Sequence, residues 1–378
     1  MNYRFIILPF LTFIATAAMA QYKSGAMHFE SPVEKKDSNS ISFAYNNLFY
    51  FKDYEYFNKI QTGYTLFGTW HYPRIVLQPN KWLRMEGGSF LQKDYGDKQL
   101  SKAIPVFSIQ VQHKYFRVIM GALEGNQTHQ LTDALMSYDN IIERPLEEGM
   151  QLIVNTERIK GDLWLDWKLR QKENANYPEE LTPGLTIDFA LTKPDKKIEV
   201  KIPVAFIMPH KGGQLDTNRC AVVGTSHNYS FGIAAEINKK ENKSWIKRMG
   251  ADLHYVGYHL YQRTQTVPYN FGDGFAGNFF LQSKWDFTLS ATYWNGCKYI
   301  APIGNKLYQS ISYLSNSSYT EQKRKLLLLN LIYEKEVYPG FFVDARYSPY
   351  VDMNNNLFEH SFLILFSYRT KFKLGKIK

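Results

Sequence analysis

Apolar and polar residues alternate with a period of two along most of the chain. In the clearest segment, Leu163, Leu165 and Trp167 alternate with Asp162 and Asp166. A strand with one face toward lipid and the other toward water needs this alternation, whereas a helix would spread the same charges around its circumference. The pattern therefore predicts β-strands with one apolar face.

The same period recurs in about sixteen segments, which are separated by stretches of turn and loop residues. They are 39–51, 62–78, 81–93, 103–112, 115–123, 147–155, 158–171, 182–192, 197–208, 228–238, 245–259, 274–283, 285–295, 324–335, 340–350 and 358–373.

The connections between these segments alternate in length. Joints such as 79–80 and 113–114 are tight, while joints such as 124–146 and 296–323 are long. Transmembrane barrels have short periplasmic turns and longer extracellular loops. We therefore predict an all-β fold, a transmembrane antiparallel up-and-down β-barrel of about 16 strands (roughly 14–18), with both termini in the periplasm. A soluble β-sandwich or propeller is the alternative, but it does not explain the alternation of the loops.

The first twenty residues have the pattern of an export signal. Arg4 precedes an apolar run, and the segment ends in Ala18-Met19-Ala20, an A-x-A cleavage site. The apolar run is too short for a comfortable membrane span. We expect a signal peptide at 1–20, a flexible periplasmic leader at 21–38, and a barrel at 39–378 in the cell outer membrane of a Gram-negative-type bacterium.

Composition agrees with a barrel. Aromatic residues make up 16% of the chain, and the net charge is +10. A nucleic-acid binder would cluster its cations, whereas here most are dispersed, so we expect contacts with lipid headgroups and no nucleic acid. Cys220 and Cys297 either form one bridge or are two free thiols.

The end of the chain carries a resemblance. The segment FLILFSYRTKFKL alternates aromatic residues, as the assembly signal of bacterial outer-membrane β-barrels does, although the chain continues past Phe372 to Lys378. Residues 121–151 (GALEGNQTHQLTDALMSYDNIIERPLEEGMQ) also look like a segment of uncharacterised barrels of this kind. From residue 39 to its end, the chain resembles the bacterial outer-membrane β-barrel proteins, porin-like in size. This resemblance implies a fold class and carries no catalytic motif.

Charged residues on the inward-facing pattern, or in the 124–146 loop, are the candidates for lining or narrowing the lumen. They are Arg84, Asp133, Asp139, Glu143, Arg144, Asp162, Asp166, Lys168 and Asp188. Such residues form cross-strand ion pairs and also set ion selectivity, and we expect both roles.

Two long loops have different expected positions. Loop 124–146 has a short stretch with apolar residues at helical spacing. It either folds into the lumen as a constriction, or it caps the outside or contacts a partner. Loop 296–323 is rich in Ser, Asn and Tyr, and its composition predicts a flexible surface loop.

No enzymatic motif stands out. Histidines such as His113, His129, His227 and His254 occur singly, with no G-x-S-x-G elbow and no metal-binding spacing. We therefore expect no enzyme, no metal and no cofactor. The preferred function is a porin-like channel for passive passage of small polar solutes. The alternative is a non-conducting barrel serving as a subunit or scaffold of an outer-membrane assembly or nutrient-uptake complex. Expected partners are outer-membrane lipid, small polar solutes, and other proteins or further copies of the chain.

Overall fold

The computed structural model describes residues 25–27, 33–173, 175–193, 196–213, 223–238, 244–263, 267–315 and 317–377. The expected signal peptide and Cys220 lie outside these residues. The strands are β1 (Ser40–Glu55), β2 (Thr65–Gln78), β3 (Leu83–Asp94), β4 (Lys102–Gln112), β5 (Phe116–Ala122), β6 (Glu148–Asn155), β7 (Ile159–Leu169), β8 (Glu179–Ala190), β9 (Ile198–Ile207), β10 (His210–Gly212), β11 (Gly224–Asn238), β12 (Ile246–Arg263), β13 (Phe271–Ser283), β14 (Phe287–Cys297), β15 (Lys323–Tyr338), β16 (Phe341–Asp352) and β17 (Leu357–Lys376).

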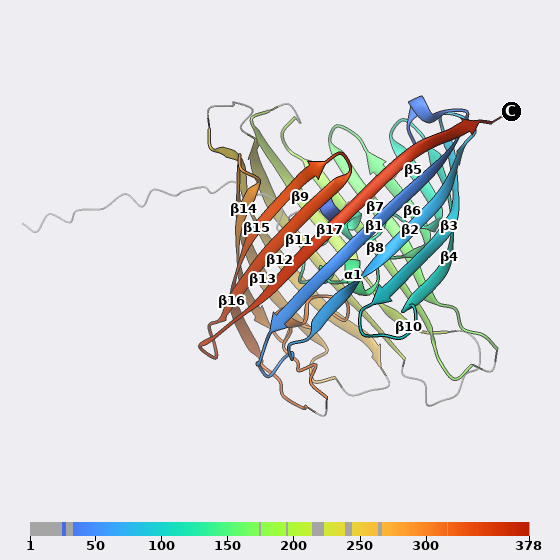
Figure 1. The fold of residues 1–378 in the computed structure, drawn as a ribbon. Coiled ribbons are helices and arrows are strands. Elements are labelled where there is room, and N and C mark those ends of the chain that lie inside the picture. Colours follow the sequence, from blue (N-terminus) through green and yellow to red (C-terminus); the bar gives the residue numbers. More distant parts are fainter. Residues whose placement is uncertain are drawn as a thin grey trace, which may run out of the picture.

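These strands form one closed antiparallel barrel (Figure 1). Apart from β9 and β10, each strand pairs with the next in the chain, and β1 pairs with both β2 and β17, which closes the sheet. The short β10 continues β9 beyond Pro209 and, like β9, lies between β8 and β11. We therefore count β9 and β10 as one strand of the wall, so the barrel has sixteen strands. The predicted fold class and strand number are confirmed.

The alternation in sequence becomes an inside and an outside. On β7, Asp162, Trp164 and Asp166 are buried in the lumen, while Leu163 and Trp167 are 49% and 44% exposed on the outer surface. Closing the sheet leaves no free edge, so the wall satisfies its own backbone hydrogen bonds within lipid. Among the described residues, none of the helices has the length and apolar character needed to cross a bilayer.

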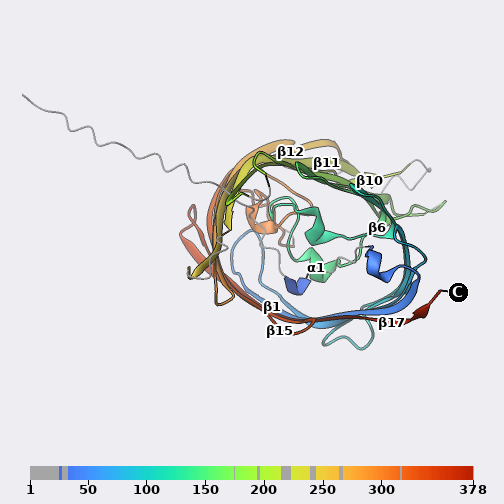
Figure 2. The ribbon, with the colours of Figure 1, turned by 90° about the horizontal axis from the view of Figure 1, so that it is seen from above.

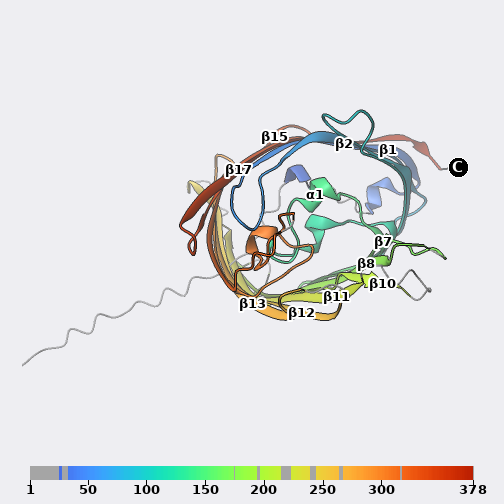
Figure 3. The same ribbon diagram turned by 90° about the horizontal axis from the view of Figure 1, so that it is seen from below.

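Both the start of β1 and the end of β17 lie at one end of the barrel, which we call the turn end (Figure 1). The long connections lie at the opposite end, the loop end. Two of these connections fold back into the lumen, as the end-on views in Figures 2 and 3 show. The β5–β6 loop (123–147) contains the 3₁₀ helix η3 (Asn126–His129) and helix α1 (Asn140–Glu143), and the β14–β15 loop (298–322) contains η4 (Lys306–Tyr308).

The two loops bind each other and together form what we call the plug. The Tyr299 hydroxyl donates to the Ala134 carbonyl at 2.9 Å, and the amide of Asn305 donates to Asp133 Oδ2 at 2.7 Å. Leu135 of one loop and Leu307 of the other are buried in the same apolar cluster. Each such side chain contributes about 1.5–3 kcal/mol when it leaves water. The lumen at the loop end therefore contains a hydrophobic core.

The expected positions of the two loops are thus resolved. The β5–β6 loop lies inside the lumen and does not cap the outside. The expectation of a flexible surface loop at 296–323 is wrong, because Tyr299 and Tyr308 are buried in the plug. Gln309 shows how a polar side chain of this loop can be buried in the plug. Its side chain bonds both the amide and the carbonyl of Ala301, at 2.9 and 2.8 Å.

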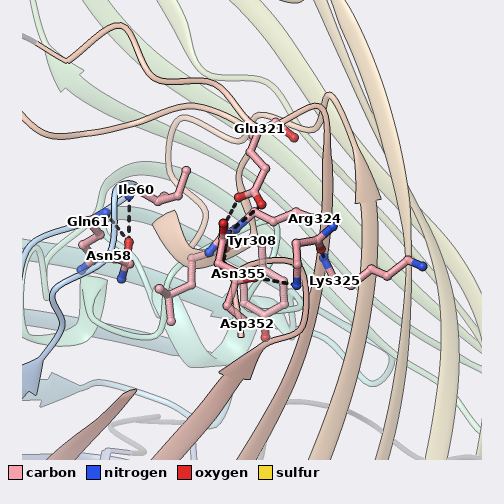
Figure 4. A network of polar contacts seen from close by, with 12 residues as sticks. Asn58, Ile60, Gln61, Tyr308, Glu321, Arg324, Lys325, Asp352 and Asn355 are labelled. Atoms are coloured by element: carbon pink, nitrogen blue, oxygen red, sulfur yellow. Dashed lines mark hydrogen bonds and ion pairs between the residues drawn. The ribbon is translucent and has the colours of Figure 1, made fainter. Parts of the chain in front are cut away.

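A buried arginine fixes the β14–β15 loop to the wall (Figure 4). Arg324 on β15 donates from Nε to the Leu307 carbonyl at 2.5 Å and from Nη1 to Asp352 at 3.1 Å, and it also pairs with Glu321. Asn355 bridges Glu321 and Asp352, at 3.0 Å to each. The neighbouring Lys325 is exposed on the outer face.

Candidate active site in the lumen

His129 is the centre of a buried polar cluster on the plug. Its ring is fully buried and stacks on the indole of Trp164, with centroids 3.7 Å apart and planes at 13°. Nδ1 lies 2.8 Å from Asp162 Oδ2, and Nε2 lies 2.6 Å from Glu147 Oε2. One imidazole thus joins two carboxylates, one on β7 and one next to the start of β6. We call His129, Glu147 and Asp162 the histidine centre.

Local structure explains how these residues meet. His129 ends η3, which begins just after β5, and the following Gln130 adopts a left-handed conformation with φ of 56° that turns the chain back into the lumen. Asp162 is an inward position of β7, and Trp164 is the next inward position along the same strand. The indole therefore supports the ring that Asp162 orients.

The electrostatics favour a charged ring. Burial alone would lower the pKa of His129, but the carboxylates of Glu147 and Asp162 outweigh it and raise the pKa to about 10. Burial likewise would raise the pKa of Glu147, and the charged His129 beside it brings that pKa below its ordinary value. The histidine centre is an imidazolium between carboxylates at neutral pH.

A further shell of pairs holds the carboxylates. The amide of Gln151 donates to Asp162 at 3.0 Å, and its oxygen accepts from the Glu124 backbone at 2.9 Å. Glu124 in turn pairs with Arg117 on β5, at 2.7 Å from Nη1 to Oε1. Because each charge in this buried region has a partner, the cluster avoids the cost of an isolated buried ion.

Two cavities border the histidine centre. The larger, about 360 Å³, is lined by Asp162 together with Arg117, Thr128, Thr186 and Asp188. The smaller, about 30 Å³, is lined by Glu147 together with residues of β7 and the plug. A volume of this size holds one water. One carboxylate of the centre therefore faces each cavity.

Five of the predicted lumen residues lie at or beside the histidine centre and its two cavities. Asp162 belongs to the histidine centre, Asp188 lines the larger cavity, and Lys168 lines the smaller one with Arg144 and Asp166. Arg144 donates to both oxygens of Asp166, at 2.5 and 2.9 Å. Their proposed role in setting ion preference stays a prediction.

The remaining candidates lie elsewhere in the lumen. Asp139 contacts Lys52 and Tyr54 of β1, and Glu143 accepts from the Tyr64 hydroxyl at 3.1 Å. Asp133 is buried against Asn305, and its burial raises its pKa to about 6. Arg84 on β3 pairs with Glu86, with Nε 2.5 Å from Oε1.

Sequence reasoning missed His129 and Glu147 as partners. They are 18 positions apart in the chain, with no motif between them, and they come together only because the β5–β6 loop folds inward. Among the described residues, no group of three or more His, Cys, Asp or Glu side chains is arranged to hold a metal ion.

Solved structures share the fold. OprD from Pseudomonas aeruginosa aligns with a TM-score of 0.51 at 9% identity, covering 91% of this chain and 98% of that one. A loop L8 deletion mutant of OmpT from Vibrio cholerae gives 0.51 at 11%, covering 88% and 100%. A BenF-like porin from Pseudomonas fluorescens Pf-5 gives 0.50 at 8%, covering 88% and 98%. At these identities the likeness shows the fold alone. The protein has the fold of the outer-membrane β-barrels, as predicted.

No curated protein matches the chain. A family model described as lipid A 3'-O-deacylase-type matches residues 33–377. This is an enzyme family, so the expectation that the chain is no enzyme is wrong. That expectation rested on the absence of a local motif, and residues that come together from a loop and a strand, as in the histidine centre, leave no such motif. Because the match spans the whole barrel, the chain belongs to the lipid A 3'-O-deacylase-type family.

Proposed function

We propose that the protein hydrolyses an acyl ester of lipid A or of a closely related acylated glycolipid, with the histidine centre as its acid–base group. The observation that carries the proposal is His129 held between Glu147 and Asp162 within a chain of this family. Imidazole–carboxylate pairs are common acid–base groups in ester hydrolysis.

In the proposed reaction, water adds to the ester carbonyl carbon and the bond from that carbon to the sugar oxygen breaks. The products are a free fatty acid and a sugar hydroxyl. Asp162, which faces the larger cavity, accepts the proton of the attacking water. His129 supplies a proton to the departing sugar oxygen, and the proton on Asp162 then restores the imidazolium.

The state described here is closed. His129 has no exposed surface, and both ring nitrogens are held by carboxylates. A lipid ester therefore reaches the centre only when the plug shifts, and the hydrogen bonds between its two loops set the free energy of that shift.

The experiment is mass spectrometry of lipid A from cells that do or do not express the protein. We expect loss of one ester-linked acyl chain with the wild-type protein and none with His129→Gln. His113→Gln, in the exposed β4–β5 turn, is the matched control and should act like wild type. An unchanged acyl pattern with folded wild-type protein at the cell surface would refute the proposal.

A second candidate is passive passage of small polar solutes. The polar cavity of about 360 Å³ and the inward-facing charges of the wall favour it. A sixteen-strand barrel without a plug has a wide lumen. Conductance in planar bilayers tests this candidate. A wild-type protein that does not conduct, together with a plug-deletion variant that does, would assign the plug a blocking role.

A further inference from the structure

A polar cluster lies on the outer face of the barrel, where lipid contacts the wall. On β1 the even-numbered residues 40–50 are buried in the lumen, so Tyr45 and Asn47 point outward. Thr69 and His71 are the matching outward positions of β2. In the strand register, Asn47 is directly opposite His71. These four residues form what we call the β1–β2 polar patch.

The patch is inside the apolar belt and not at its edge. Toward the turn end, Phe43 packs on Phe372 with ring centroids 5.2 Å apart. Toward the loop end, Phe49 packs on Phe366 at 5.8 Å. Strands β17, β1 and β2 lie side by side across this wall (Figure 1). Polar side chains are thus flanked by aromatic residues on both sides along the strands, where lipid offers no hydrogen bonds.

Internal contacts fix the orientation of the Asn47 amide. Its Nδ2 atom donates to the Trp70 carbonyl at 3.0 Å and to Thr69 Oγ1 at 3.1 Å, and it lies 3.2 Å from Nδ1 of His71. The two amide hydrogens point toward this group of acceptors, and a proton on Nδ1 of His71 would oppose them, so we assign Nδ1 as the unprotonated nitrogen, which accepts from the Tyr45 hydroxyl at 2.7 Å. The ring proton of His71 therefore lies on Nε2.

Two polar atoms of the patch remain without a partner. Within the part of the chain that the structure describes, neither His71 Nε2 nor Asn47 Oδ1 makes a hydrogen bond. One is a donor and the other an acceptor, and both face hydrocarbon. An unsatisfied polar atom in this environment is costly, so such residues mark a contact with another polar group.

We propose that the β1–β2 wall is the interface of a homodimer, in which His71 Nε2 of each copy donates to Asn47 Oδ1 of the other. A two-fold axis along the membrane normal keeps both copies at the same depth and makes the contact isologous. The patch is self-complementary because it carries one free donor and one free acceptor on directly paired residues. Two symmetric hydrogen bonds then satisfy all four atoms.

The first measurement is the number of subunits, counted by photobleaching steps of labelled protein in phosphatidylethanolamine–phosphatidylglycerol vesicles. Wild type is expected to be dimeric. His71→Leu or Asn47→Leu alone should weaken dimerisation by roughly ten-fold, because each removes one partner from both bonds. His259→Leu, an outward-facing histidine on β12, is the matched control and should remain dimeric. Heat-modifiable gel mobility shows that each variant is folded.

The second measurement separates a specific contact from a general effect on the wall. When His71→Leu and Asn47→Leu proteins are mixed, their heterodimer keeps one complete His71–Asn47 bond and pairs two leucines. Random pairing of an equal mixture would give heterodimer and the two homodimers in a ratio of about 2:1:1, and two-colour counting should find a larger share of heterodimer than this. A monomeric wild type, or a mixture with no preference for the heterodimer, would overturn the proposal. Deacylation by the histidine centre is independent of both results.

Discussion

The imidazole of His129 lies flat on the indole of Trp164, with ring centroids 3.7 Å apart, so the plug and the barrel wall share one rigid contact at the buried charge centre. Asp162, two residues before Trp164 on β7, holds Nδ1 of the same ring at 2.8 Å. One strand thus supplies both the surface on which the ring packs and the charge that orients it. This arrangement holds the imidazole in a fixed orientation inside the lumen.

The first prediction concerns the two faces of the wall. Leu165→Arg places a charge on the lipid-facing side of β7 and should cost about 2–4 kcal/mol of unfolding free energy near the bilayer midplane. Asp188→Asn changes an inward residue whose partner Lys201 is partly solvated, and it should cost much less. Urea unfolding in vesicles measures both, and equal tolerance would contradict the assignment of faces.

The second prediction is a pH dependence. The pKa of His129 is about 10 in the folded protein, above its ordinary value of roughly 6.5 in the unfolded chain. The stability that its charge contributes is therefore complete below about pH 6.5 and is lost as pH rises toward 10, a change of a few kcal/mol. Unfolding midpoints between these pH values should fall for wild type and change less for His129→Gln. Parallel profiles for the two proteins would rule out a raised pKa.

The third prediction tests the arginine that holds the β14–β15 loop. Arg324→Met leaves Asp352 and Glu321 without their cation, and breaking a buried pair of this kind costs about 3–5 kcal/mol. The loop should then become sensitive to protease added outside the cell. Lys325→Met, at the adjacent exposed position, is the control and should resist cleavage like wild type. If both variants resist, Arg324 does not hold the loop in place.

The fourth prediction concerns the plug as an obstruction. Deleting Thr128 to Ile142 removes the second half of η3, most of α1 and the loop between them. We expect conductance in planar bilayers to rise while the sheet still forms a complete barrel, because the sixteen wall strands pair with one another independently of the loop. A folded deletion variant that conducts no better than wild type would contradict the view that this part of the β5–β6 loop is the obstruction.

The sequence predicts the strands because lipid and water impose opposite demands on successive residues. It places their ends less well at the loop end. β1 continues to Glu55 and β12 to Arg263, beyond the expected ends at 51 and 259. These extensions include charged residues such as Lys52 and Asp53, so the apolar face is lost there while backbone pairing continues. Backbone pairing between strands therefore extends beyond the residues that carry the lipid-facing apolar pattern.

The candidate site is predictable only in part. Asp162 and Asp166 are inward by alternation, but nothing local indicates that His129 reaches Asp162, because that contact depends on how a loop folds into the lumen. The composition of the β14–β15 loop shows that its side chains are polar, but it does not show whether their hydrogen-bond partners are water or other residues of the protein. Ser310 illustrates the difficulty, since its hydroxyl accepts from the Tyr299 amide at 3.1 Å inside the plug. A polar loop in contact with water has the same composition.

The most direct test of the central claim is release of fatty acid from purified lipid A by the protein in mixed detergent micelles. Wild type should release an ester-linked acyl chain, and His129→Gln should reduce the rate by roughly 100-fold or more, as loss of an acid–base group does. His113→Gln should retain the wild-type rate. Equal release by wild type and His129→Gln, or none from folded wild type, would contradict the assignment of the histidine centre as the active site.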